Sequence, residues 1–340
     1  LGLSDTVAAN MQSNLTAFSY LLPLFGAVIV DKYIGARYTT PVGMFIAAAG
    51  YFTGGIAKSS AGVYAMIFLV SLGLALFKNG AIIGRVITDK SQMDPAFSMR
   101  YTLVNVGAFI GTFLVGILYK DVFAKDGVLG FAPCFKMAAL MMVLGGLWYI
   151  FVCWRFLGDL GKLPFKKTLT EEEKAAEAKK KEETGTKQPL TTIEKKRIGA
   201  IFVASLFSIV FWIFWYLGYM PVYFYWAENM DWVVAGYQVP STWFDAANSL
   251  FCVILGPVTA ALWKKLAERP QGDMSLFRKT GLGIAIIGVG YLFYAAIDIM
   301  RGGEKASVLW LIVFAFLLTM GEMFFSPLGH SFISKYSPSR

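Results

Sequence analysis

Long apolar runs constrain the fold of this chain more than any other feature of its sequence. A helix needs about 20 mostly apolar residues to cross the hydrocarbon core of a bilayer. Nine segments are apolar enough and close to that length: 15–30, 40–56, 64–83, 102–118, 137–154, 198–225, 243–263, 280–300 and 308–333. They are too long and too continuously apolar for the strands of a membrane barrel, so we predict spanning α-helices.

The charge content supports a membrane protein. Only 16% of the 340 residues are charged and 56% are hydrophobic, whereas about 25% of a soluble domain is charged. The net charge of +9 would suggest nucleic acid as a partner of a soluble chain. Here the basic residues fall mostly in short loops, so we expect a lipid bilayer as the partner and no nucleic acid. The fold class that follows is all-α and polytopic.

The loops between the runs alternate in charge. Twenty-four of the 31 Lys and Arg residues lie in one set of loops, which includes 32–37, 155–197 and 264–279, and six lie in the other set. Basic loops stay on the cytoplasmic side of a membrane. We therefore predict a multi-pass protein of the cell membrane, inner or plasma, with residue 1 outside and residue 340 inside.

A polar segment, 158–197, divides the apolar runs into two groups. Its Glu171–Glu173 and Lys179–Lys181 runs are typical of a solvated linker. The predicted domains are a half of five helices (1–157), a cytoplasmic linker (158–197) and a half of four helices (198–340). This plan resembles the major facilitator superfamily, which has six helices in each half.

Motifs narrow the resemblance. The first run and the turn after it contain Tyr20, Pro23, Gly26, Asp31, Gly35 and Arg37. Their order resembles the pattern Tyr-x-x-Pro-x-x-Gly-Gly-x-x-Ala-Asp-x-x-x-Gly-x-Arg of the proton-coupled oligopeptide transporters. An Asp and an Arg beside a glycine turn can bridge two helix ends and separate when the halves rock. The alternative is a simple turn with inside charges.

Further motifs follow in the family's order. Phe77-Lys78 resembles the start of Phe-Lys-Pro-Asn, and Asn105 lies in a stretch similar to Phe-Ser-x-Phe-Tyr-x-x-Ile-Asn. In the second half, Asn248 and Pro257 fit Asn-Pro-Leu-Phe…Pro. The segment Gly321, Glu322, Ser326, Pro327 and Gly329 fits Gly-Glu-x-x-x-Ser-Pro-x-Gly. The resemblance covers nearly the whole chain.

The resemblance implies a function and a place for each motif. It implies a secondary active transporter that imports di- and tripeptides with protons by alternating access. It also implies that nine of twelve membrane helices are present, the first and the last two being absent. The family's Glu-x-x-Glu-Arg motif would then precede residue 1.

Lys78 and Glu322 are the clearest ionisable residues within the apolar runs, and they lie in opposite halves. A charge in a spanning helix costs about 2.5–3.5 kcal/mol on insertion scales, so it normally faces a partner or a cavity. A cation and an anion on opposite walls would recognise the two termini of a peptide. By resemblance they pair when substrate is absent. The alternative is a buried salt bridge without a substrate role.

Three polar residues complete the predicted substrate site. Asn105 and Asn248 could hydrogen-bond peptide groups or bond between helices, and Tyr20 lines the site by resemblance. Glu322 is the predicted proton-coupling residue, because Trp215 stands where the family has an acid. We predict Gly26, Asp31, Gly35, Arg37, Ser326 and Pro327 to be gating or structural motif residues.

Other functions stay open at this point. A major facilitator carrier of another solute, a drug exporter and a non-transporting membrane sensor fit the helices as well. An enzyme is not expected, because the sequence shows no nucleophile–base set, metal cluster or phosphate loop. We expect no cofactor. The three cysteines, Cys134, Cys153 and Cys252, are expected to be small packing residues.

Overall fold

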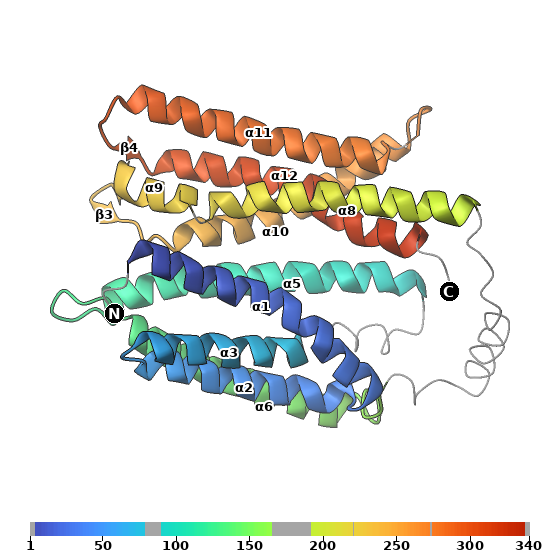
Figure 1. The fold of residues 1–340 in the computed structure, drawn as a ribbon, viewed down its shortest axis with the longest axis horizontal. Coiled ribbons are helices and arrows are strands. Elements are labelled where there is room, and N and C mark those ends of the chain that lie inside the picture. Colours follow the sequence, from blue (N-terminus) through green and yellow to red (C-terminus); the bar gives the residue numbers. More distant parts are fainter. Residues whose placement is uncertain (1–3, 79–89, 165–191, 220, 273, 337–340) are drawn as a thin grey trace. The chain divides into compact units, whose positions relative to one another are not determined.

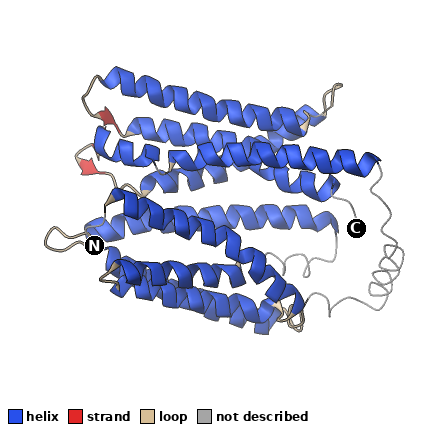
Figure 2. Ribbon diagram, viewed as in Figure 1, coloured by secondary structure: helices blue, strands red, loops and turns tan. Residues whose placement is uncertain are grey.

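A computed structural model gives the fold, and it describes residues 4–78, 90–164, 192–219, 221–272 and 274–336. Almost all of the described chain is helical, with four two-residue strands (Figure 2). Residues 165–191, which hold most of the predicted linker, lie outside the described residues. The all-α prediction is confirmed.

The helices group into two compact units, which we describe separately (Figure 1). Unit 1 contains α1 (Asp5–Lys32), α2 (Ala36–Ile56), α3 (Ser60–Phe77), the start of α5 (Lys90–Ile117), the π-helix η2 (Leu118–Val122) and α6 (Phe131–Phe156). Unit 2 contains residues 100–117 of α5, α8 (Thr192–Gly218), α9 (Pro221–Asn229), α10 (Trp243–Ala267), α11 (Leu276–Arg301) and α12 (Leu309–Tyr336). The predicted halves, 1–157 and 198–340, are continuous in the sequence, whereas residues 100–117 belong to unit 2. The predicted division stays a prediction.

The predicted spanning segments correspond to helices. Within the described residues, seven helical stretches are long and apolar enough to cross a membrane, and the apolar part of α12 is a shorter stretch, Leu309–Phe324. The segment 198–225 is divided between α8, which ends at Gly218, and α9, which begins at Pro221. Proline has no N–H group to continue the hydrogen-bond ladder, which explains why one helix ends there.

Glycines allow the helices of unit 1 to approach closely. A Cβ atom added to Gly73 of α3 would lie 2.5 Å from the Gly43 carbonyl oxygen of α2, and one added to Gly43 would lie 2.6 Å from the Gly73 oxygen. A Cβ on Gly26 of α1 would overlap the backbone of Ala75 in α3. Small residues at helix contacts are typical of membrane bundles.

Aromatic side chains fill the core of unit 2. Phe211, Trp226 and Phe314 are almost fully buried. The Trp226 ring packs edge-on against Tyr294 of α11 at 4.6 Å between centroids, and Phe314 of α12 is stacked with Phe244 of α10 at 6.5 Å. The core of this unit therefore lies where α8, α10, α11 and α12 meet.

Short strands join the loops at one end of unit 2. β1 (Met230–Asp231) pairs in parallel with β4 (Ala306–Ser307), and β2 (Val233–Val234) pairs antiparallel with β3 (Tyr237–Gln238). The β1–β4 pair links the loop after α9 to the loop after α11.

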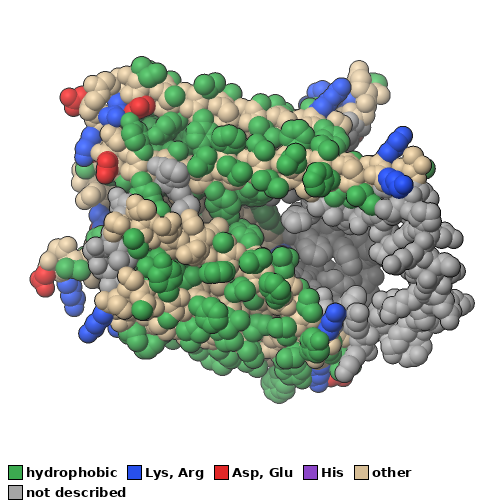
Figure 3. Space-filling model, in the orientation of Figure 1, with side chains coloured by type: hydrophobic (Ala, Val, Ile, Leu, Met, Phe, Trp, Pro, Cys, Tyr) green, Lys and Arg blue, Asp and Glu red, His purple; other side chains and the backbone are tan. Residues whose placement is uncertain are grey.

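Apolar side chains cover the outer sides of the helices, and charged side chains gather near the helix ends (Figure 3). Among the exposed apolar residues are Leu24, Phe68, Trp148, Phe202 and Leu292. Contact with lipid explains this distribution, because a soluble protein rarely exposes apolar patches larger than a few hundred Å².

Candidate functional site

Two of the predicted substrate residues lie together in unit 1. Lys78 follows the last residue of α3 and caps it, with its backbone N–H donating to Leu74 O at 3.0 Å. Its ammonium Nζ lies 4.2 Å from the centre of the Tyr20 ring of α1. A cation over an aromatic face is stabilised by about 0.5–1 kcal/mol when exposed, and both side chains are exposed. This contact positions the ammonium without burying it.

The predicted turn motif joins α2 to the end of α6. The Arg37 guanidinium donates to Cys153 O at 2.7 Å and to Gly158 O, and its backbone N–H donates to Gly161 O at 3.0 Å. Gly35 tolerates no side chain, because a Cβ there would overlap the backbone of Gly161 and Lys162. Arg37 therefore bridges two helix ends. The side chain of Asp31 lies outside the described part of the structure.

The second charged site is in unit 2, where α8, α10 and α12 converge. Glu322 of α12 is 8% exposed. The Asn248 amide of α10 donates to Glu322 Oε2 at 3.2 Å and to the Thr319 hydroxyl at 2.9 Å. The Trp215 indole of α8 lies near the carboxylate, but its Nε1 has no hydrogen-bond partner among the described residues. The carboxylate is thus held by a neutral amide, and Asn248 bonds between helices, as the sequence left open.

Trp215 belongs to a row of aromatic rings on α8. Its ring centroid lies 5.4 Å from that of Trp212 and 4.4 Å from that of Tyr219. The Tyr219 ring in turn packs on Phe244 of α10 at 4.9 Å. The family pattern has an acid at this position, and here the packed indole of Trp215 occupies it beside Glu322.

Asn105 lies on α5, near two residues that sequence reasoning did not assign to the site. Its amide donates to the Tyr101 carbonyl of its own helix at 3.0 Å. The Tyr101 hydroxyl reaches the Cys252 sulfur of α10 at 3.8 Å, and Tyr101 also lies in the electrostatic field of Glu322. Cys252 is buried and free, as are Cys134 and Cys153. A tyrosine and a cysteine within apolar runs carry no charge signal that could have identified them.

The remaining predicted residues are placed only by their backbone. Ser326 and Pro327 lie within α12, and the structure describes no more of them than the helix. Lys78 is in unit 1 and Glu322 in unit 2, so their pairing stays a prediction.

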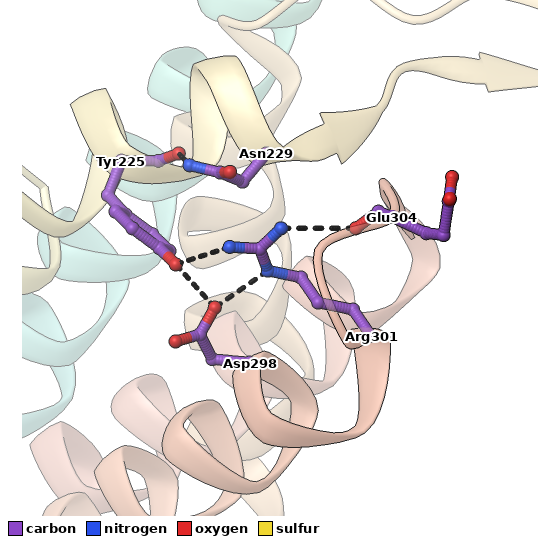
Figure 4. A network of polar contacts seen from close by, with 5 residues as sticks. All are labelled: Tyr225, Asn229, Asp298, Arg301 and Glu304. Carbon is purple, nitrogen blue, oxygen red and sulfur yellow. Dashed lines mark hydrogen bonds and ion pairs between the residues drawn. The ribbon is translucent and has the colours of Figure 1, made fainter.

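A separate polar network joins α9 to α11 (Figure 4). The Arg301 guanidinium donates to Asp298 Oδ1 at 2.7 Å, to the Tyr225 hydroxyl at 2.7 Å and to Glu304 O at 3.1 Å. The Tyr225 hydroxyl donates to Asp298, and Asn229 donates to the Tyr225 carbonyl at 2.8 Å. The charges in this network are paired, which favours a structural role.

Two further features of the described residues bear on ligands. No group of three or more His, Cys, Asp or Glu side chains there could hold a metal ion. An apolar cavity of about 160 Å³ lies between α8 and α11, lined by Phe211, Phe214, Ile284, Ile287, Gly288 and Tyr291. Its lining contains none of the predicted site residues.

Comparison with known proteins yields both a family and relatives. Residues 158–340 match the sequence profile described as PTR2, POT family. A "Di-/tripeptide transporter" of Lactococcus lactis subsp. cremoris is 24% identical over 388 aligned positions, which cover 99% of this chain and 76% of the relative. "Peptide transporter YePEPT" of Yersinia enterocolitica is 33% identical over 115 positions, or 33% of this chain and 22% of the relative.

Solved structures share the fold. The structure titled "Crystal structure of peptide transporter POT in complex with sulfate" superposes with a TM-score of 0.85 at 24% identity, covering all of this chain and 76% of the other. A "POT family transporter in complex with 5-aminolevulinic acid" gives a TM-score of 0.84 at 23% identity, with 99% and 77% covered. The fold expected from the motifs is confirmed.

Proposed function

The chain belongs to the POT family, and we propose that it is a secondary active transporter that imports di- and tripeptides together with protons by alternating access. The printed names of its relatives support peptides as the substrate class. The same names are those of transporters and not of enzymes. The apolar helices support a site within the lipid bilayer.

The observation that carries this proposal is the pair of charged sites at Lys78 and Glu322. The ammonium of Lys78 is exposed beside Tyr20 and available to a carboxylate. Glu322 is held by neutral partners, which do not cancel its charge. In this proposal Lys78 binds the peptide carboxylate and Glu322 the peptide ammonium, with Tyr20, Asn105 and Asn248 as their neighbours. Such a site recognises the peptide backbone whatever the side chains are.

Glu322 is also the proposed proton-coupling residue. The Asn248 side chain suits a group that changes protonation, because an amide can donate to a carboxylate and accept from a carboxylic acid. A protonated Glu322 would release the peptide ammonium and reset the cycle. Arg37 and its motif partners Gly26, Asp31, Gly35, Ser326 and Pro327 would take part in the rocking of the halves.

Uptake into proteoliposomes tests this function. The complete protein should concentrate a labelled dipeptide when an inward proton gradient is imposed, and Glu322→Gln should abolish that accumulation. Glu228→Gln, which neutralises an exposed acid on α9, is the matched control and should behave as the unmodified protein. Trp215→Glu should fold and steepen the pH dependence of uptake.

Each outcome has a separate meaning. If Glu322→Gln still concentrates the dipeptide, Glu322 is not the coupling residue. If the unmodified protein binds peptide but ignores the gradient, proton symport is wrong and a facilitator replaces it.

We place the protein in the cell membrane with residue 1 outside and with the linker and residue 340 in the cytoplasm. Single-cysteine variants at two exposed positions, Val128 and Gln271, test this topology. An impermeant thiol reagent added to intact cells should label Val128→Cys and not Gln271→Cys. The reverse pattern would invert the topology.

A further inference from the structure

Asp245 is an acidic residue of unit 2 that the proposed mechanism does not use. It lies in the first turn of α10, three residues before Asn248. Residues three apart share one face of a helix. Asp245 is therefore on the same face of α10 as the amide that holds Glu322.

The depth of Asp245 follows from this contact. Glu322 is 13 residues beyond the first residue of α12, Leu309, which is about 20 Å at a rise of 1.5 Å per residue. Asn248 is at the same level because it bonds to Glu322, and Asp245 is about 4.5 Å nearer the start of α10. Asp245 thus lies about 15 Å along the bundle from the start of α12, and its side chain is exposed.

The Tyr219 hydroxyl lies in the electrostatic field of both Asp245 and Glu322. Its ring packs on Phe244, the neighbour of Asp245, and on Trp215, which interacts with Glu322. The hydroxyl is buried and has no hydrogen-bond partner within the described ranges. A buried hydroxyl without a partner costs about 1–3 kcal/mol, so a change of side-chain conformation that brought a carboxylate to it would be favourable.

A structural role explains Asp245 less well. At the third position after the N-cap, Thr242, an acid can close a capping box, but the Thr242 side chain makes no capping bond. No hydrogen bond or ion pair of Asp245 occurs among the residues that the structure describes. The helix dipole stabilises an acid in the first turn by only about 0.3–1 kcal/mol.

We propose that Asp245 is a second proton-binding carboxylate of this transporter, on the same face of α10 as the Asn248 amide that holds Glu322. Each carboxylate takes up one proton outside and releases it inside, so no other reactant is needed. The other titratable groups that face the cluster are Tyr219, Tyr101 from α5 and Cys252 on α10. Tyrosine and cysteine stay neutral near pH 7, which leaves the two acids to bind protons. The inference rests on the proposed proton symport.

The steady-state accumulation of a dipeptide tests this stoichiometry. With the membrane potential clamped at zero, a gradient of one pH unit supports about tenfold accumulation for one coupled proton and about 100-fold for two, since each pH unit is worth about 1.4 kcal/mol. Asp245→Asn in the complete protein should lower this ceiling about tenfold. Counterflow of peptide without a gradient should stay within about twofold of the unmodified protein, because binding is retained. A purely structural defect slows transport but does not move the ceiling.

Three further variants make the test decisive. Asp245→Glu should restore the ceiling, and Glu228→Gln should leave it unchanged. Tyr219→Phe keeps the ring contacts and should slow the approach to an unchanged ceiling.

An unchanged ceiling in Asp245→Asn would overturn the proposal. Loss of counterflow in both Asp245→Asn and Asp245→Glu would also overturn it, because the role would then be structural. An unmodified protein that shows no gradient-driven accumulation would instead refute the proposed function itself.

Discussion

Unit 1 and unit 2 present their charged residues in opposite ways. Lys78 of unit 1 is exposed at a helix end and touches an aromatic ring. Glu322 of unit 2 is 8% exposed and is held by the Asn248 amide. The cation can therefore change partners at little cost, whereas any change at the anion disturbs a buried hydrogen-bonded group. The proposed function uses this difference, with the exposed cation as a ligand-binding group and the buried carboxylate as the proton-binding group.

The two units also differ in how their helices pack. Glycine–glycine contact brings α2 and α3 together in unit 1, whereas aromatic rings fill the core of unit 2. Unit 1 thus packs backbone against backbone and carries an exposed charge, whereas unit 2 packs aromatic rings and holds a buried charge.

The largest effect is expected where the backbones touch. Gly73→Leu would force a side chain against the Gly43 carbonyl and should destabilise unit 1 by about 3 kcal/mol or more. Thermal unfolding in detergent should show it as loss of folded protein or a clearly lower Tm. Gly256→Leu, at a glycine of α10 with no atom within 4 Å of an added Cβ, is the control. Equal losses in both variants would refute the contrast in packing.

The next effect concerns peptide affinity. Lys78→Gln removes the exposed cation and should raise KM for dipeptides about tenfold or more, since a hydrogen bond to a charged group is worth about 1.5–3 kcal/mol. Lys78→Arg should recover part of the affinity. The Tm of both variants should stay close to that of the unmodified protein, because Lys78 is exposed. An unchanged KM in Lys78→Gln would remove this residue from the substrate site.

A smaller effect is expected at the network between α9 and α11. Arg301→Gln leaves Asp298 and Tyr225 without their charged donor and should loosen the contact between α9 and α11. Hydrogen exchange should become faster in α9 and in the last turns of α11. Lys305→Gln, at an exposed position nearby, should exchange as the unmodified protein does. Unchanged protection in Arg301→Gln would show that the network does not hold these ends.

The smallest effect concerns Asp159 and Lys162, an exposed ion pair of unit 1. The two residues are three apart in the sequence, as Asp298 and Arg301 are. Lys162 holds the pKa of the Asp159 carboxyl below its ordinary value, mainly through a hydrogen bond. A depressed folded-state pKa stabilises the protein above the unfolded pKa, and this stabilisation is lost as the pH falls through the folded value. Because the pair is exposed to water, Lys162→Gln should leave the Tm at pH 7 unchanged. A carboxyl NMR titration should show the Asp159 pKa returning toward its ordinary value, and a pKa that does not move would contradict the assignment.

The fold was largely predictable because lipid imposes a simple rule on the sequence. The described parts of the apolar runs are almost entirely helical, since no other open element satisfies the backbone in hydrocarbon. The break before Pro221 was missed because apolar character continues through 198–225. The pairing of β1 with β4 joins two residues on each side, too few to produce a pattern.

The site was predictable only where charge or motif marked it. Lys78 and Glu322 stand out because ionisable residues are rare in spanning helices. Their neighbours depend on helix packing, so the contact of Lys78 with Tyr20 and that of Glu322 with Trp215 appear only in the structure. Tyr219 is one aromatic residue among many in the apolar run 198–225, and the sequence alone places Asp245 only near the start of the run 243–263. The contact of Asn248 with Glu322 is what relates Asp245, on the same face of α10, to the buried carboxylate.

The break between α8 and α9 makes α9 more firmly connected to α11 than to α8. Pro221 has no N–H to donate to the Leu217 carbonyl, so the α8–α9 junction resists bending less than a continuous helix does. Beyond it, Tyr225 and Asn229 belong to the same polar cluster as Arg301 of α11 (Figure 4). A movement of α8 would therefore bend the chain at the α8–α9 junction, and α9 would keep its position relative to α11. Spin labels on α9 and α11 should accordingly keep a fixed separation during the transport cycle. The separation of a label pair on α8 and α9 should change as the angle between these helices changes.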